Sequence, residues 1–154
     1  MPNVISNTSC LILLDNSGLL SILEKLYGKV FITPEVSREF GKTTDNWIEI
    51  REVKDRKYFT TLSAFIDPGE ASTISLAMEM TGPLLILDDL KARKRKIAER
   101  LNLRMTGTLG VLLKAKEKKI VLKTANSLLQ DLKQSGLRIS QEMEKRFIEL
   151  SGEL

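Results

Sequence analysis

The feature that most constrains the fold is a run of four apolar residues at positions 84–87, which stops abruptly at Asp88 and Asp89. Gly82 and Pro83 stand directly before the run, so residues that interrupt regular structure precede it. A short, continuous apolar run of this kind is typical of a strand that is covered on both faces. Such strands belong to parallel sheets with helices packed on either side.

Similar short segments recur along the chain and alternate with helical patterns. Strands are expected at residues 4–5, 29–32, 84–87 and 104–106, with a more exposed edge strand at 47–53. Helices are expected at 11–14, 19–26, 34–40, 68–80, 90–101, 108–118, 122–135 and 141–150, whereas residues 54–61 show no readable pattern. The alternation predicts an α/β fold with a mostly parallel central sheet flanked by helices.

The expected helices begin at recognisable capping residues. Thr33 precedes Pro34 and is the predicted cap of one helix, and residues 67–70 have the form of a capping box with Asp67 as the cap. Thr108 and Ser140 are the predicted caps of two later helices. In the last helix, the expected apolar stripe consists of Met143, Phe147 and Leu150. We expect a single domain over residues 1–154, with a core in 1–120 and C-terminal helices in 121–154.

The chain contains no histidine and a single cysteine, Cys10. Histidine-based triads, histidine metal sites, thiolate zinc clusters and internal disulfides are therefore excluded. A buried structural thiol is the favoured interpretation of Cys10, because no imidazole is present to activate it. An enzyme with this composition must work with carboxylates, hydroxyls, lysine, arginine and metal ions.

The net charge of +4 is concentrated in residues 88–104, where seven basic residues face three acidic ones. This cluster favours a polyanionic partner, nucleic acid before membrane. A solvated helix face is an equally good interpretation, since Asp89 with Arg93 and Arg95 with Glu99 are ordinary i,i+4 pairs. No apolar run is long enough to span a membrane and no signal peptide is recognisable, so a cytoplasmic location is expected.

Acidic and amide side chains follow the predicted buried strands. Asn7 and the pair Asp88 and Asp89 come directly after strands, while Glu39 and Glu70 are expected in or near the first turns of their helices. Oxygen ligands without histidine or thiolate select Mg²⁺ or Mn²⁺. Each residue also has a structural interpretation, as a helix cap or as part of a solvated ion pair, and spacing alone does not decide between them.

Five blocks in order along the chain resemble the signature blocks of PIN-like domains found among prokaryotic toxin-type ribonucleases. They are VISNTS at residues 4–9, PEVSRE at 34–39, GEA at 69–71, LILDDLKAR at 85–93 and TGTLGVLLKA at 106–115. The resemblance implies a PIN-like three-layer fold with a helical C-terminal tail. It also implies RNA cleavage with a carboxylate-bound Mg²⁺ or Mn²⁺.

Transferred by motif, the resemblance implies a site of Asn7, Glu39, Glu70 and Asp89, with Asp88 beside it. Asn7, Glu70 and Asp89 would be the metal ligands, with Asn7 standing where the family usually has an aspartate. Ser9 and Thr106 would be polar neighbours of the metal or phosphate. The predicted phosphate-binding residues of the basic segment are Lys91, Arg93, Lys94 and Arg95.

The predicted function is a metal-dependent endoribonuclease, the toxin of a toxin–antitoxin pair or a relative of one. The resemblance further implies a homodimer and a small antitoxin partner, with no membrane association. A catalytically silent module that binds nucleic acid or a protein is the main alternative, because Asn7 removes one negative charge. An aspartyl-phosphate enzyme is disfavoured because Asn7 cannot be its nucleophile, and no phosphate-binding glycine fingerprint indicates a nucleotide-binding domain.

Overall fold

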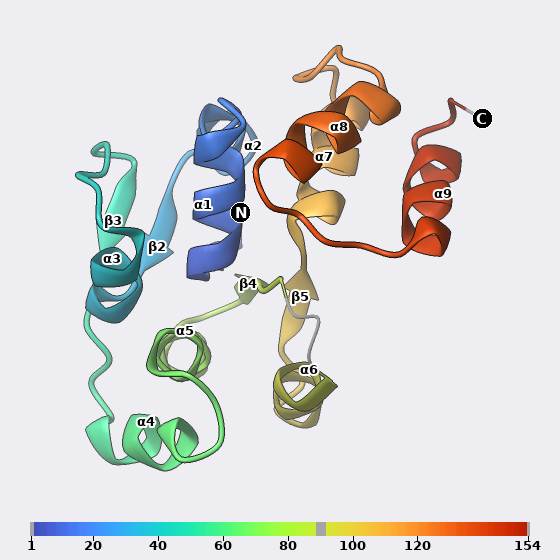
Figure 1. The fold of residues 1–154 in the computed structure, drawn as a ribbon. Helices are drawn as coiled ribbons and strands as arrows, with labels where there is room; N and C mark the ends of the chain where they lie inside the picture. The colour runs from blue at the N-terminus through green and yellow to red at the C-terminus, as the bar shows by residue number, and fades with distance from the viewer. Residues whose placement is uncertain (1, 89–91, 154) are drawn as a thin grey trace.

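The computed structural model describes residues 2–88 and 92–153, and these residues form a five-stranded sheet in which every strand pair is parallel (Figure 1). The strand order is β3-β2-β1-β4-β5. The strands are β1 (Asn3–Ser6), β2 (Val30–Ile32), β3 (Ile48–Ile50), β4 (Pro83–Ile86) and β5 (Arg104–Thr106). The predicted α/β class and parallel sheet are therefore confirmed.

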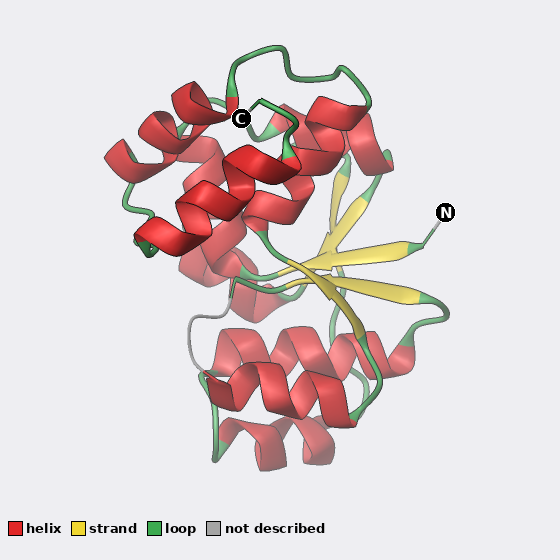
Figure 2. Cartoon of the chain, turned by 90° about the vertical axis from the view of Figure 1, so that its right-hand side faces the viewer, coloured by secondary structure: helices red, strands yellow, loops and turns green. Residues whose placement is uncertain are grey.

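Helices cover both faces of the sheet and give three layers (Figure 2). The helices are α1 (Thr8–Asn16), α2 (Ser21–Tyr27), α3 (Pro34–Phe40), α4 (Arg56–Ser63), α5 (Pro68–Glu79), α6 (Ala92–Arg100), α7 (Thr108–Glu117), α8 (Ala125–Gln134) and α9 (Gln141–Leu150). The larger core lies under α1, α2, α7, α8 and α9, and the smaller core under α4, α5 and α6. Helix α3 contacts both α1 and α5.

The strands divide their side chains between the two cores with the period of two that a β-strand imposes. Val4 of β1 packs into the larger core and Ile5 into the smaller one. In β4, Leu84 and Ile86 join the larger core, whereas Leu85 joins the smaller. The continuous apolar run in β4 is thus explained by cover on both faces.

Several predicted helix ends are confirmed. The Thr33 hydroxyl accepts a hydrogen bond from Val36 N at 3.1 Å, with Pro34 at the first helical position of α3. Ser140 caps α9 by accepting from Met143 N at 3.2 Å. Gly28, which was not singled out above, ends α2 with φ +76°, a conformation that glycine adopts without strain.

Other local predictions are wrong. Residues 56–63, most of which lie in the stretch without readable pattern, form helix α4. Asp55 caps this helix, and its carboxylate accepts a hydrogen bond from Tyr58 N at 3.0 Å. Asp67 precedes α5, but its side chain makes no cap hydrogen bond, so the Asp67 half of the predicted capping box does not form. Thr108 is the first residue of α7 rather than its cap, because Gly107 occupies the capping position.

The predicted apolar stripe of α9 is only partly buried. Phe147 is 2% exposed and packs into the larger core, whereas Met143 is 45% and Leu150 62% exposed. The C-terminal helices therefore attach to the main core mainly through Phe147 and the buried leucines of α8. Within the described ranges, no helix combines the length and apolar character needed to cross a membrane.

Candidate functional site

The polar residues after β1 and β4 meet at the carboxyl edge of the sheet, as predicted. These strands are neighbours, with Ser6 in register with Ile86. Asn7 is the next residue after β1, and its backbone N–H donates to the Ile86 carbonyl at 2.9 Å. Asp88 lies two residues beyond the end of β4. The parallel register therefore brings Asn7 and Asp88 to one place although 81 positions separate them in the chain.

Asn7 is buried, at 1% exposed, and its side chain caps α1. The side-chain oxygen Oδ1 accepts a hydrogen bond from Cys10 N at 3.1 Å. Because a backbone N–H can only donate, this contact fixes which end of the amide is the oxygen. The amide nitrogen Nδ2 is buried and makes no hydrogen bond within residues 2–88 and 92–153. Asn7 therefore presents an unsatisfied donor, not an acceptor, with its Nδ2 group.

Both oxygens of Asp88 are hydrogen-bonded to Thr108. Thr108 N donates to Oδ1 at 2.7 Å, and the Thr108 hydroxyl donates to Oδ2 through a short contact. Burial raises the pKa of Asp88, and these two hydrogen bonds oppose the rise because they favour the charged carboxylate. The carboxylate thus holds the first turn of α7 against the end of β4. Sequence reasoning treated Thr108 as a cap and missed this partnership, although the residue lies in one of the resemblance blocks.

Cys10 connects Asn7 to the Asp88 side of the site. Burial, with a smaller contribution from the negative charge of Asp88, raises the pKa of the Cys10 thiol to about 12. Hydrogen bonds with Thr108 and Ser6 act in the opposite direction. A fully buried thiol with this pKa stays protonated and is a poor nucleophile. The predicted structural role of Cys10 is consistent with this environment.

Glu39 reaches the same edge from α3. It lies in the last turn of that helix, so the prediction of a first-turn position is wrong. Its side chain is exposed, and its Oε1 accepts from the Thr8 hydroxyl at 3.4 Å. Glu39 also lies against Gly69, which directly precedes Glu70 in the first turn of α5. These contacts link the residue after Asn7 to Glu39 and to the start of α5.

Three glycines lie directly against candidate site residues. A Cβ atom on Gly69 would lie 1.8 Å from Glu39 Oε1, and one on Gly107 would lie 2.8 Å from Asp88 Oδ1. A Cβ atom on Gly110 would lie 2.3 Å from the Thr106 hydroxyl oxygen. None of the three has a positive φ, so close packing rather than backbone conformation requires glycine there. The glycines of the resemblance blocks thus leave room for polar side chains.

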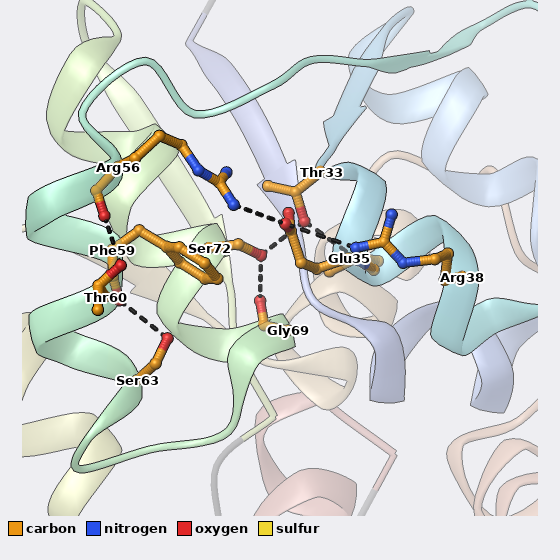
Figure 3. Close-up of polar contacts among 10 residues, drawn as sticks. Thr33, Glu35, Arg38, Arg56, Phe59, Thr60, Ser63, Gly69 and Ser72 are labelled. Carbon is orange, nitrogen blue, oxygen red and sulfur yellow. Dashed lines mark hydrogen bonds and ion pairs between the residues drawn. The ribbon is translucent and has the colours of Figure 1, made fainter.

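Glu35 is an acidic residue of this region that sequence reasoning did not single out. It is 9% exposed, and its Oε2 forms ion pairs with Arg56 at 3.5 Å and Arg38 at 3.6 Å (Figure 3). Nearby, the Thr33 and Ser72 hydroxyls lie 2.6 Å apart, which ties the start of α3 to α5. The only available signal was its position in the block at 34–39, where an acidic residue in the first helical turn has an ordinary structural explanation.

A pocket of about 560 Å³ adjoins the acidic edge. Asp88 and two of the predicted polar neighbours, Ser9 and Thr106, line it. The structure therefore brings Ser9, Asp88 and Thr106 to a common cavity, while Glu39 lies on the opposite side of Asn7, next to Thr8.

The predicted metal ligands supply hard oxygen donors, the chemical class that suits Mg²⁺ or Mn²⁺. Across residues 2–88 and 92–153, however, no three acidic or thiol side chains come together closely enough to hold a metal ion. Asp88 already accepts two hydrogen bonds from Thr108, and the Asn7 oxygen is engaged by Cys10 N. The described side chains therefore do not complete a metal site by themselves.

Some predicted site residues cannot be placed in this geometry. Asp89 and Lys91 lie outside the described residues. Arg93, Lys94 and Arg95 belong to α6, but their side chains also lie outside what is described. Their assignments remain predictions.

A family model described as DUF3368, PIN domain, matches residues 3–153. The matched range runs from β1 to the residues after α9, so it includes both the acidic edge and the C-terminal helices. Comparisons with curated proteins and with solved structures found no match.

Proposed function

The chain belongs to the DUF3368 family of PIN domains, and on that premise we propose that it is a divalent-metal-dependent endoribonuclease. PIN domains are commonly nucleases and generally use divalent metals. The observation that carries the proposal is the meeting of Asn7 and Asp88 at the ends of adjacent parallel strands, with Glu39 joined to the same edge through Thr8. Loops at the carboxyl ends of parallel strands are where α/β proteins place their chemistry.

In this proposal the acidic residues share the work at a phosphodiester. Asn7, Glu70 and Asp89 form the metal-binding set, and Asp88 fixes the start of α7 beside them. Glu39 or Glu70 orients or deprotonates the attacking water. A bound Mg²⁺ or Mn²⁺ would supply a water of lowered pKa and offset the charge on the phosphate oxygens.

In this proposal, neutral and basic side chains bind the RNA strand. Ser9 and Thr106 donate hydroxyl hydrogen bonds to phosphate oxygens at the pocket wall. Lys91, Arg93, Lys94 and Arg95 bind flanking phosphates, a contact that is independent of base sequence and weakens with salt. The choice of RNA over DNA follows the family resemblance and is part of the proposal.

We also propose that the protein acts in the cytoplasm as the toxin of a toxin–antitoxin pair, as a homodimer that a small antitoxin protein binds. The C-terminal part of the chain exposes an apolar side chain suited to protein contacts, Leu122, which is 84% exposed. Size-exclusion chromatography with light scattering tests the dimer directly.

A silent PIN domain is the second candidate function, and a specific observation favours it. The buried Asn7 Nδ2 is a donor where a metal site needs an acceptor, and the Asp88 oxygens are held by Thr108. In that case the basic segment binds nucleic acid without cleaving it.

The test is cleavage of a labelled mixed RNA pool in Mg²⁺, Mn²⁺ or EDTA by the wild type and by an Asp89→Asn/Glu70→Gln variant. A Glu24→Gln/Glu117→Gln variant is the matched control, because it removes two charges from exposed positions away from the site. Metal-dependent cleavage that only the first variant loses supports the nuclease. Inert wild type with cleavage restored by Asn7→Asp establishes the silent relative instead.

A further inference from the structure

The pocket beside the acidic edge joins segments that are far apart in the chain. Its walls come from α1, from residues 105–110 at the start of α7, and from residues 135–143. Its volume of about 560 Å³ is within the range of small-molecule binding sites. The C-terminal segment therefore contributes a wall to the region where the predicted site residues gather.

The lining of the pocket combines apolar and polar side chains. Ile12 of α1 and Met143 of α9 contribute apolar surface that is 37% and 45% exposed. Of the described residues that line the pocket, Asp88 and Arg138 are the charged ones. Arg138 is also exposed to solvent, so its guanidinium can bind an anion next to the pocket.

We propose that this pocket binds the base of one RNA nucleotide next to the cleaved bond, with Arg138 on an adjoining phosphate. The inference rests on the proposed function and adds a substrate subsite to it. Asp88 and Thr106 belong both to the carboxyl edge of the sheet and to the pocket lining. An RNA strand that binds along this edge would therefore also lie next to the pocket. Aliphatic and thioether side chains cover the apolar faces of a base, and Arg138 matches its phosphate.

The proposal gives residues 135–143 a role in substrate binding. The chain reverses between α8 and α9 there, and Gly136 has φ +108°, which a residue with a side chain adopts only with strain. This turn brings Arg138 and Ile139 into the pocket lining, to which α1 also contributes. The C-terminal tail is then part of the substrate site, not only an attachment to the core.

Binding of labelled hexaribonucleotides measured by fluorescence anisotropy in EDTA tests the subsite without cleavage. The probes are hexauridylate, hexaadenylate and a fully abasic ribose-phosphate hexamer. For the wild type we expect the better base-bearing probe to bind about fivefold more tightly than the abasic one, an effect at the lower end of that of stacking one base on an aromatic ring. Both probes carry the same number of phosphates, so the ratio of their dissociation constants removes the contribution of phosphate binding to the basic surface.

Met143→Glu should reduce that ratio to near one, because it places a carboxylate on the apolar wall. Leu150→Glu is the matched control, since it adds the same charge to the same helix outside the pocket lining. Arg138→Gln should weaken all probes alike, whereas Arg146→Gln, an equal charge change on exposed α9 surface, should not. Both comparisons use exposed positions, so unfolding does not account for a difference.

The proposal is overturned if the wild type binds base-bearing and abasic probes equally, or if Met143→Glu and Leu150→Glu behave alike. It is also overturned if Met143→Glu instead changes the oligomeric state, since a second copy of the chain would then occupy the pocket. Cleavage assays of the same proteins in Mn²⁺ separate the two ideas. Base preference without cleavage defeats the nuclease alone, and cleavage without base preference defeats the subsite alone.

Discussion

Two acidic side chains flank Asn7 at the carboxyl edge of the sheet, and they are held in opposite ways. Asp88 is partly buried, and Thr108 donates to both of its oxygens. Glu39 is exposed, and the hydrogen bond that its Oε1 accepts from the Thr8 hydroxyl is long, at 3.4 Å. One side of the site is therefore fixed by the fold, while the other consists of a side chain that can move.

This difference indicates which of the two carboxylates stabilises the fold and which is available for chemistry. The Asp88 carboxylate joins the end of β4 to the start of α7 through Thr108, so a role in folding alone is enough to explain it. Glu39 is exposed and should contribute little to stability, so its placement against Thr8 and Gly69 is harder to explain without a role in function. Measuring stability and cleavage side by side distinguishes the two duties.

The largest expected effects come from removing each carboxylate. Asp88→Ala and Glu39→Ala should each reduce RNA cleavage by about 100-fold or more if both serve the chemistry. Only Asp88→Ala should also lower the free energy of unfolding, by roughly 1–3 kcal/mol, because it leaves Thr108 N without its acceptor. Glu39→Ala should stay within about 0.5 kcal/mol of the wild type, as an exposed substitution does. Urea denaturation and cleavage on the same preparations measure both, and equal stability losses would refute the comparison.

Adding a methyl group beneath each carboxylate is a milder way to separate the two sides. Gly107→Ala forces an atom against Asp88, which is held by Thr108 and has little room, so we expect a destabilisation of about 1–3 kcal/mol. Gly69→Ala meets only the flexible end of Glu39, which can swing into solvent. Its stability should change by less than about 1 kcal/mol, because alanine also favours the helix. Cleavage should fall in both variants, and a Gly69→Ala protein with full activity would argue against a role for Glu39.

Local patterns in the sequence were sufficient to predict most of the fold. The apolar run before Asp88 identified β4, and Thr33 with Pro34 identified the start of α3. Helix α4 was missed because its apolar face is short, with Tyr58, Phe59 and Leu62, and two threonines of low helix propensity lie within it. The exposure of Met143 could not be predicted, because a stripe pattern does not show how far a terminal helix overlaps the core.

The candidate site was predictable only where strand ends define it. Asn7 and Asp88 meet because parallel register places them together, and that rule is readable from sequence. The partnership of Thr108 with Asp88 and the contact of Glu39 with Gly69 depend on how separate segments pack. Periodicity carries no information about such contacts, and the glycines of the blocks were the one local trace of them.

Asn7→Asp should sharpen the comparison by changing the residue between the two sides. Aspartate also accepts the hydrogen bond from Cys10 N, so the cap on α1 persists, but a buried carboxylate near Asp88 should lower the free energy of unfolding by more than about 1 kcal/mol in EDTA. The buried donor becomes a second oxygen with a negative charge, so Mn²⁺ should bind several-fold more tightly. Isothermal titration calorimetry measures the affinity, with Asn46→Asp as an exposed control. Unchanged Mn²⁺ affinity would show that position 7 does not contact the ion.

The smallest expected effect is an absence of reaction at Cys10. Its pKa of about 12 leaves the thiol protonated at pH 8, and the side chain is fully buried. Mass spectrometry after treatment of the folded protein with iodoacetamide should therefore find no label, while unfolding in urea should allow complete labelling. Glu39→Cys places a second thiol on the exposed side and should take up one label per chain under the same conditions. If native Cys10 reacts as fast as that residue, the Asp88 side opens readily, and the contrast between a fixed and a movable carboxylate does not hold.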